Sequence, residues 1–295
     1  MADEYVIGLD RLIDRALDED IGAGDCTTRA IVPAHVSARG VFVTREDGVI
    51  AGLPVAERVY TRLNPAVRCD YRVVEGSRVE AGAVLAEVHG PARAILTGER
   101  VALNFLRHLS GIATRTAFMV ERISGLPARV VDTRKTTPVM RSLEKYAVRI
   151  AGGKNHRFGL YDGILIKDNH IRVAGGVKEA VKLAREGAPH GLRIEVEAET
   201  LTQVEEALAA GAEIIMLDNM PVALMQEAVR LIGGRSVIEA SGGITEENIR
   251  AVAATGVDLI SVGALTHSVR ALDISLEIED VSEGVTHAAL RHDEA

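Results

Sequence analysis

The chain has 295 residues, 47% of them hydrophobic and 26% charged, which is typical of a globular protein with a large apolar core. Its length fits one large domain or two. Aromatic residues make up only 3%, so a platform that stacks the bases of single-stranded nucleic acid is disfavoured. The net charge of −8 likewise disfavours a broad basic surface that neutralises a polyanion.

The cysteines and the N-terminus indicate the compartment. Cys26 and Cys69 offer neither a disulfide framework nor a metal-ligand spacing, so we expect both thiols to be reduced. The N-terminal segment is acidic and amphipathic, unlike a secretory signal. No run of about 18 apolar residues is long enough to span a membrane. We therefore expect a cytoplasmic protein.

The first part of the chain mixes helical periodicity with short strand-like runs. The expected elements are a helix at Gly8–Asp20, strands at Ala38–Thr44, Gly48–Ala51 and Val67–Val74, and helices at Ala92–Leu109 and Ile112–Ile123. Between them, residues 73–90 form short runs separated by glycines, which favours a β-hairpin layer. It resembles a lipoyl- or biotin-carrier hairpin, but residues 1–134 contain no lysine, so a covalent carrier is excluded.

From about residue 129 strands and helices alternate with a repeat of 20-odd residues, which is typical of βα units in a parallel sheet. The expected strands are 128–134, 163–169, 192–199, 212–219, 236–243 and 257–264, and the expected helices are 175–187, 200–211, 221–233 and 245–256. Six strands are two short of a complete (β/α)₈ barrel. We therefore predict an incomplete or irregular α/β barrel rather than a doubly wound open sheet.

Charged or hydroxyl residues follow all six expected strands. Reactive groups of α/β barrels lie at the carboxyl ends of the strands, so we expect an active site at this edge. A polar residue after one strand would mean little, because strand ends are often polar loops. The residues concerned are Asp132, Arg134, Lys135, Lys167, Asp168, Glu195, Glu197, Glu199, Asp218, Glu239, Ser241, Ser261 and Gly263.

Lysine usage points to a local positive pocket. All six lysines lie between Lys135 and Lys182, and residues 134–172 carry nine Lys or Arg against three acids. A solvated face or chance clustering could produce this pattern. The sharper interpretation is a focused positive pocket that concentrates a small anionic substrate.

Two glycine-containing turns suit phosphate. Ser241–Gly243 precedes a helix expected to begin near Thr245, and Val262–Ala264 follows the last strand. Glycine lets backbone N–H groups approach an anion, and a helix N-terminus favours negative charge. An ordinary helix-entry turn is the alternative for the first of these segments.

Carboxylates and histidines complete the candidate set. Glu195, Glu197 and Glu199 alternate along one strand, so we expect them on one side of it. Together with Asp218, at least one of them could hold Mg²⁺ or face a developing cation, although ion pairs with the basic stretch would also explain them. For His156 and His170 we favour contacts to the anion or to its ligands over acid–base roles.

The motifs together resemble those of quinolinate phosphoribosyltransferases, also called nicotinate-nucleotide pyrophosphorylases (carboxylating). The resemblance covers essentially the whole chain, including GERVALNFLRHLSGIAT at Gly98–Thr114, and the order of its motifs is specific. These motifs are DTRKT at Asp132–Thr136, GGKNHR at Gly152–Arg157, IKDNH at Ile166–His170, EVE at Glu195–Glu197, LDN at Leu217–Asn219, SGG at Ser241–Gly243 and VGALTHS at Val262–Ser268.

The resemblance implies the type II phosphoribosyltransferase fold. Residues 1–111 would form an N-terminal α/β sandwich domain, joined by the C-terminal segment 270–295, and residues 112–269 an open α/β barrel of about seven strands. The implied reaction joins quinolinate to the phosphoribosyl group of phosphoribosyl pyrophosphate. It gives nicotinate mononucleotide, pyrophosphate and CO₂ with Mg²⁺ and no organic cofactor, as the entry to NAD synthesis. The implied assembly is a homodimer whose active sites are shared between the chains.

The resemblance also assigns residues. Quinolinate would be bound by Thr133, Arg134, Lys135, His156, Arg157, Lys167 and Arg100 of the partner subunit. Phosphoribosyl pyrophosphate would be bound by Glu197, Asp218, Ser241, Gly242, Gly243, Val262, Gly263 and Ala264. Lys135, Glu197 and Asp218 would be catalytic, with Glu197 and Asp218 also at the metal. The alternatives are a family paralogue with another substrate, a non-catalytic phosphate-binding barrel, and an aldolase with a Schiff base at Lys167.

Overall fold

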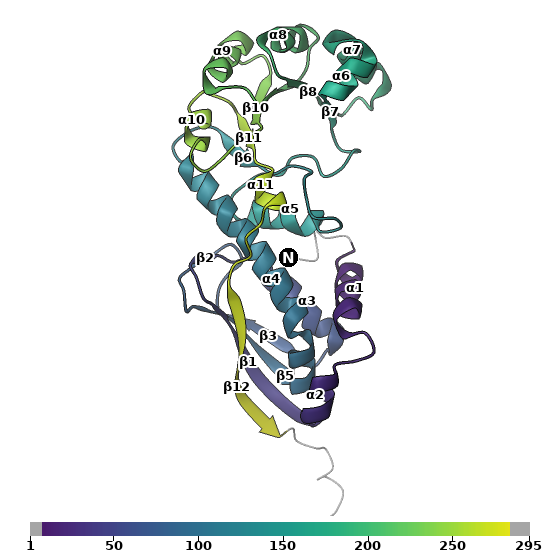
Figure 1. Cartoon of the computed structure of the whole chain (residues 1–295), viewed down its shortest axis with the longest axis vertical. Coiled ribbons are helices and arrows are strands. Elements are labelled where there is room, and N and C mark those ends of the chain that lie inside the picture. The colour runs from purple at the N-terminus through teal and green to yellow at the C-terminus, as the bar shows by residue number, and fades with distance from the viewer. Residues whose placement is uncertain (1–7, 284–295) are drawn as a thin grey trace, which may run out of the picture. The chain divides into compact units, whose positions relative to one another are not determined.

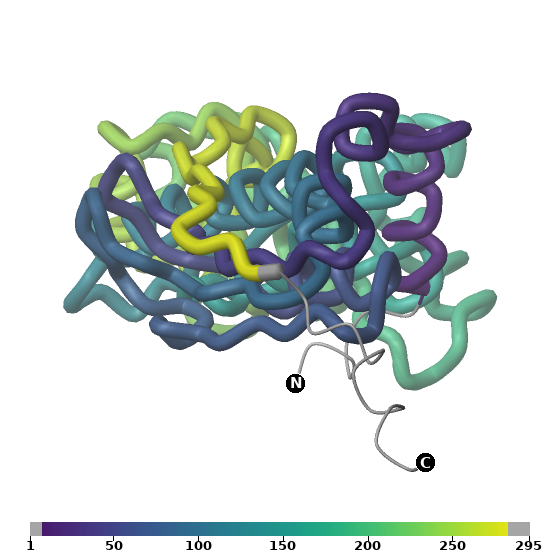
Figure 2. The backbone as a smooth tube through the Cα atoms, turned by 90° about the horizontal axis from the view of Figure 1, so that it is seen from below, coloured from purple at the N-terminus to yellow at the C-terminus, as the bar shows by residue number. Residues whose placement is uncertain are grey.

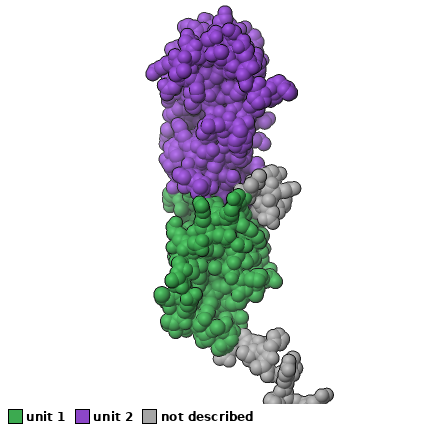
Figure 3. Space-filling model, turned by 90° about the vertical axis from the view of Figure 1, so that its right-hand side faces the viewer, with its two compact units in different colours: residues 1–114, 270–295 green, residues 115–269 purple. Residues whose placement is uncertain are grey.

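The computed structural model describes residues 8–283 and divides into two compact units (Figure 3). Unit 1 contains Met1–Thr114 and Arg270–Ala295, and unit 2 contains Arg115–Val269. The boundary falls within helix α4 (Ala92–Arg122), three residues beyond the division expected from the sequence. Residues 1–7 and 284–295 of the expected N-terminal domain lie outside the described part of the chain.

Unit 1 is built on an antiparallel four-stranded sheet in the order β12-β1-β5-β3 (Figure 1). These strands are β1 (Val36–Thr44), β3 (Arg68–Tyr71), β5 (Val84–Pro91) and β12 (Ile274–Glu283). The last strand of the chain pairs along β1 from Val36 with Glu283 to Thr44 with Ile274, and Figure 2 shows the two tubes running together. Strand Ile274–Glu283 is therefore part of the sheet of the N-terminal unit.

Helices of unit 1 cover one face of this sheet. They are α1 (Leu9–Ile21), α2 (Cys26–Ile31), α3 (Leu53–Leu63) and the first part of α4. Tyr60 of α3 packs its ring against Phe42 of β1, with ring centroids 6.2 Å apart, and both side chains are fully buried. The α/β sandwich expected for this unit is confirmed.

The expected hairpin within residues 73–90 is wrong in its pairing. The short strand β4 (Arg78–Val79) pairs with β2 (Gly48–Val49) in a separate two-stranded sheet. Strand β5 instead lies between β1 and β3, because its residues Leu85, Ala86 and Val88 are apolar and almost fully buried, as a central strand requires.

Helix α4 is continuous where the sequence suggested a break at Ser110–Gly111. The Ser110 hydroxyl accepts a hydrogen bond from the N–H of Ala51 and donates one to its carbonyl. A Cβ atom on Gly111 would lie 2.1 Å from the carbonyl oxygen of Arg270. The two small residues therefore permit close packing of chain segments instead of ending the helix.

Unit 2 is a parallel six-stranded sheet in the order β6-β11-β10-β9-β8-β7. The strands are β6 (Arg129–Val131), β7 (Ile164–Ile166), β8 (Ile194–Ala198), β9 (Ile214–Asp218), β10 (Val237–Ser241) and β11 (Leu259–Ser261). The helices are α5 (Arg141–Ile150), α6 (Asp168–Ala174), α7 (Val177–Gly187), α8 (Leu201–Ala209), α9 (Val222–Ile232), α10 (Ile249–Ala253) and α11 (Ala264–His267). All six expected strands are present.

The sheet of unit 2 curves into a barrel that stays open. Within residues 8–283 no ladder joins the edge strands β6 and β7, although one parallel bridge pairs Val131 of β6 with Lys154. Helices α7, α8 and α9 lie outside the strands (Figure 1). The open α/β barrel expected from the sequence is confirmed, with six strands and this bridge in place of seven strands. None of the described helices is long and apolar enough to cross a bilayer.

Candidate active site

A cavity of about 510 Å³ opens at the carboxyl ends of the unit 2 strands, a size typical of ligand sites. Its walls combine basic, acidic and hydroxyl side chains with two glycines. The lining residues are Thr133, Arg134, Lys135, His156, Arg157, Leu165, Lys167, Glu197, Met216, Asp218, Asn219, Glu239, Ser241, Gly242, Gly243 and Ser261. The edge of the sheet expected to hold the site is therefore the edge that contains the cavity.

Most of the residues that the resemblance assigns to the substrates meet there, and four do not. Val262, Gly263 and Ala264 are not among the lining residues, and Arg100 lies exposed on α4 in unit 1. Val262 is buried, with its N–H donated to the carbonyl of Val131. Gly263 lies close to the site, since a Cβ atom there would be 3.3 Å from the Lys135 side chain.

Two arginines form the strongest anion-binding feature of the cavity. The Nε atoms of Arg134 and Arg157 are buried and have no hydrogen-bond partner among the described residues. Arg157 donates from its Nη1 to the carbonyl of Gly163 at 2.8 Å. Burial, and then the neighbouring Arg134, lowers the pKa of Arg157. Two crowded guanidiniums with unused donors favour an anion with more than one negative group.

A buried ion pair anchors the loop that carries Arg157. Asp132, at the end of β6, accepts hydrogen bonds from the ammonium of Lys145, from the N–H of His156 at 2.9 Å and from Asn155 at 2.5 Å. The same ammonium donates to the carbonyl of His156 at 2.9 Å. Asp132 and Lys145 are both fully buried, and burial lowers the pKa of Lys145.

This ion pair of Lys145 was not predicted from the sequence. Lys145 belongs to the basic stretch that was expected to bind an anion, yet its charge is neutralised by Asp132 in the interior of unit 2. Lys145 and Glu144 lie on α5 among the buried residues Leu143, Ala147 and Val148, so charged residues interrupt the apolar face of the helix. That interruption was the only local signal for a buried ion pair.

The acidic part of the cavity is formed by β8 and β9. Lys167 lies 3.3 Å from both carboxylate oxygens of Glu197. Burial raises the pKa of Glu197; Lys167 opposes that shift, and the charge of Asp218 adds to it. Two carboxylates close enough to repel each other are a donor set that suits Mg²⁺.

Asp218 is oriented by its neighbour. The side-chain amide of Asn219 donates to its carboxylate at 2.9 Å, and the Asn219 backbone takes a positive φ of 54°. A Cβ atom on Gly242 would lie 2.2 Å from the Asn219 amide oxygen. Glycine at position 242 therefore leaves room for the residue that positions Asp218.

The glycine turn after β10 lines the cavity, but the helix after it differs from the one expected. Gly242 and Gly243 both have positive φ, 86° and 61°, and line the cavity. The helix expected at 245–256 is wrong in its extent, because α10 begins at Ile249 and has five residues. The intervening residues form a turn in which Asn248 accepts the N–H of Thr245 and donates to Gly243, so any dipole contribution from the helix is small.

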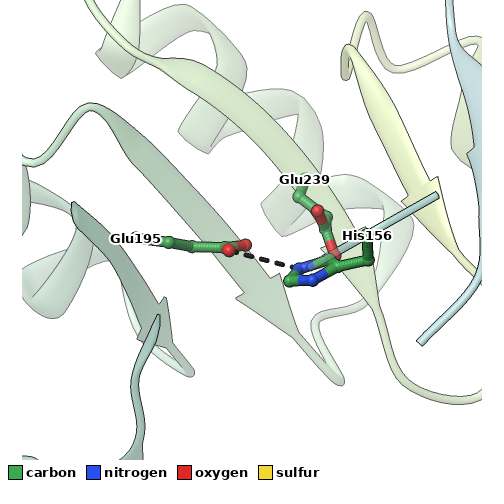
Figure 4. Close-up of side chains that lie close together, drawn as sticks. All are labelled: His156, Glu195 and Glu239. Atoms are coloured by element: carbon green, nitrogen blue, oxygen red, sulfur yellow. Dashed lines mark ion pairs between the residues drawn. The ribbon is translucent and has the colours of Figure 1, made fainter. Parts of the chain in front are cut away.

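His156 lies between two buried carboxylates, and Figure 4 shows its ring directed at both. Its Nε2 is 3.2 Å from Glu195 and 3.7 Å from Glu239, while its Nδ1 accepts the N–H of Arg157 at 2.8 Å. Both ring nitrogens are thus engaged within the protein. A substrate contact through either nitrogen would require one of these interactions to break.

The alternating glutamates of β8 separate in role. Glu195 is buried against His156, Glu197 lines the cavity, and Glu199 is exposed beyond the end of the strand. His170 also serves locally, since its Nδ1 accepts the N–H of Lys167 at the start of α6. Of the three glutamates expected on one side of the strand, Glu197 is the one that lines the cavity.

Comparisons with known proteins agree along the chain. The quinolinate phosphoribosyl transferase C-terminal and N-terminal domain families match residues 112–277 and 25–110. A probable nicotinate-nucleotide pyrophosphorylase (carboxylating) of Bacillus subtilis (strain 168) is 46% identical over 277 residues, covering 94% of this chain and 96% of its own. The corresponding protein of Mycobacterium leprae is 47% identical over 272 residues, covering 90% and 95%. The crystal structure of NadC from Streptococcus pyogenes superposes with a TM-score of 0.89 at 44% identity, covering 94% and 98%.

Proposed function

The chain belongs to the quinolinate phosphoribosyltransferase family, and we propose that the cavity of unit 2 is where its reaction takes place. The reaction transfers the phosphoribosyl group of phosphoribosyl pyrophosphate to quinolinate and releases pyrophosphate and CO₂. The product, nicotinate mononucleotide, enters NAD biosynthesis. The observation that carries the placement is the convergence of Arg134 and Arg157, each with an unused buried donor, on one cavity.

The two anionic substrates suit two different parts of the cavity wall, one formed by basic side chains and one by the glycine turn. Quinolinate has two adjacent carboxylates, which Arg134, Arg157 and Lys135 would bind by charge-assisted hydrogen bonds. The phosphates of the second substrate would lie against the turn Ser241–Gly243, whose glycines let the backbone come close. Lys167, which already faces Glu197, lies where it could contact either substrate.

Glu197 and Asp218 would hold Mg²⁺. Their mutual repulsion and their place in the cavity wall fit a divalent cation better than two free carboxylates. When bound, the cation would neutralise charge on the pyrophosphate leaving group. Asn219 would keep Asp218 in place through its hydrogen bond.

Loss of pyrophosphate generates positive charge on the ribose carbon, and the carboxylates of Glu197 and Asp218 would stabilise that charge. Attack by the quinolinate nitrogen then makes the ring cationic. When the neighbouring carboxylate leaves as CO₂, its electron pair stays on the ring carbon, where the adjacent cationic nitrogen stabilises it until a proton is added, so no organic cofactor is needed. The arginines would keep the ring oriented throughout both steps.

The cavity is proposed to be completed by a second chain. Arg100 is exposed on α4 in unit 1 and is not among the lining residues of the unit 2 cavity. In a homodimer, Arg100 of the partner subunit would add a third guanidinium to the quinolinate site. We place the enzyme in the cytoplasm, where both of its free cysteines would stay reduced.

The test is an assay of pyrophosphate and CO₂ released from phosphoribosyl pyrophosphate with Mg²⁺. We expect both products with quinolinate and neither with nicotinate, which lacks the 2-carboxylate. Release of pyrophosphate with nicotinate, or its absence with quinolinate, would refute the proposed function. A family paralogue with another substrate predicts that no pyrophosphate is released with quinolinate.

A further inference from the structure

The cluster of His156, Glu195 and Glu239 reaches the cavity wall through His156 and Glu239, and substrate binding does not account for its two buried carboxylates (Figure 4). Glu195 of β8 is 4% exposed and Glu239 of β10 is 1% exposed. One oxygen of each carboxylate, Oε1, has no hydrogen-bond partner in the described structure. Burying two carboxylates with unused oxygens is costly, so the pair calls for a functional explanation.

The hydrogen positions in the cluster follow from one backbone contact. The N–H of Arg157 points at Nδ1 of His156, so Nδ1 carries a lone pair and the hydrogen is on Nε2. That Nε2–H donates to Glu195. The three ligand atoms are close enough together, within 4.8 Å, for a metal ion. A metal ion would need a lone pair on Nε2 of His156, and that nitrogen carries the hydrogen. The cluster therefore suits a bound proton better than a metal ion.

Glu239 is the member that holds an acidic proton. It faces Glu195, His156, Ser261 and Asp132, and Lys145 is already paired with Asp132. Burial and the charge of Glu195 raise the pKa of Glu239 to about 7, against smaller opposing effects of His156 and Ser261. Glu239 also lines the cavity, whereas Glu195 does not. The cavity wall therefore contains a carboxyl group that can hold and release a proton near neutral pH.

We propose that Glu239 is the catalytic acid that protonates the pyridine ring carbon from which CO₂ departs. The inference rests on the proposed function. The bond between the ring carbon and its carboxylate breaks, and its electron pair stays on the ring carbon beside the cationic nitrogen. That pair takes the proton of Glu239, and the Glu239 carboxylate regains a proton from water before the next turnover. His156 is a positioning residue, because its Nε2–H, 3.7 Å away, stabilises the carboxylate formed.

The test measures both released products in the Glu239→Gln variant. Glutamine keeps the shape and a hydrogen-bond donor but cannot give up a proton. Wild type should release CO₂ and pyrophosphate in equal amounts. In the variant we expect CO₂ release to fall at least tenfold relative to pyrophosphate release, with the phosphoribosylated dicarboxylate accumulating. Continued pyrophosphate release would itself show that the variant is folded and binds both substrates.

The matched controls are Glu195→Gln and Glu239→Asp. Glu195 lies outside the cavity wall but its charge raises the pKa of Glu239, so Glu195→Gln should lower CO₂ release relative to pyrophosphate release less than Glu239→Gln does. Aspartate retains the acid and should restore more of the CO₂ release than glutamine does. Equal losses of both products in Glu239→Gln, or no change, would overturn the inference alone. A wild type inactive with quinolinate would remove the proposed function as well. A metal ion retained through chelation by wild type, but not by Glu239→Gln, would also overturn it.

Discussion

The two units of the chain differ in where they put their charges. Unit 1 keeps its ion pairs near the surface, as in Arg39 and Arg72 with Glu87, whose arginines are 38% and 51% exposed. Unit 2 instead buries charges. Its almost fully buried ionisable side chains are Asp132, Glu144, Lys145, Glu195 and Glu239.

The difference separates a scaffold from a site. Buried charges are expensive, and apolar residues of the same shape often stabilise a fold as well or better. Unit 1 avoids that cost because its sheet only has to pack and pair. Unit 2 carries it at the strand ends, where one network positions Arg157 and another holds a proton against the cavity. The following predictions, from the largest expected effect to the smallest, test this contrast.

The largest effect is expected for Lys145→Met. The change leaves the buried charge of Asp132 without a counterion, which should lower the free energy of unfolding by about 3–5 kcal/mol. Urea unfolding of the variant measures the loss. Arg62→Met in unit 1, which removes an exposed partner of Asp14, should cause a much smaller loss. Equal losses in the two variants would contradict the contrast between the units.

The cavity arginine and lysine come next. Arg157→Ala and Lys135→Ala should each lower kcat/KM for quinolinate at least 10²-fold, which is about 2.7 kcal/mol of transition-state stabilisation. Lys178→Ala, on the exposed face of α7, is the control and should leave kcat/KM unchanged. Near-wild-type activity in either cavity variant would refute the placement of the substrate.

Close packing in unit 1 can be tested at Gly111. A Cβ atom there would meet the carbonyl of Arg270, so Gly111→Ala should cost about 1–3 kcal/mol of unfolding free energy. Gly187 ends α7 in unit 2 with open space around it, and Gly187→Ala should be neutral or slightly stabilising. Thermal unfolding compares the two. A stabilised Gly111→Ala would show that the helix does not need the glycine.

The pH dependence of stability should have opposite signs in the two units. Arg39 and Arg72 lower the pKa of Glu87 to about 2, so its contribution is present above about pH 4.5 and is lost as pH falls toward 2. The raised pKa of Glu239, about 7, gives a contribution that is present below pH 4.5 and is lost as pH rises through 7. The slope for one proton is at most about 1.4 kcal/mol per pH unit.

Paired variants isolate the two slopes. Between pH 5 and 8, the unfolding free energy of wild type should fall relative to that of Glu239→Gln as the pH rises. The difference between wild type and Glu87→Gln should be constant above pH 4.5 and shrink as the pH falls toward 2. A difference for Glu239→Gln that is constant with pH would mean that Glu239 is ionised throughout this range.

Most of unit 2 could be predicted from the sequence, and less of unit 1. The βα repeat is local, so periodicity located all six strands, from Arg129–Val131 to Leu259–Ser261. In unit 1 the partner of a short strand is decided by distant segments, so β4 was assigned to the wrong neighbour. Helix α10 starts later than expected because Asn248 and Gly243 close a turn first.

The sequence by itself determined which residues gather at the cavity. Many of them, such as Lys135, Lys167 and Asp218, lie where a strand ends, and the carboxyl ends of parallel strands meet at one edge of a sheet. Only the tertiary structure decided which charges remain free for substrate. Lys145 is neutralised by Asp132, 13 residues away, and His156 is engaged by two glutamates from two other strands. Such pairings depend on how the strands lie beside one another, and no local pattern records them.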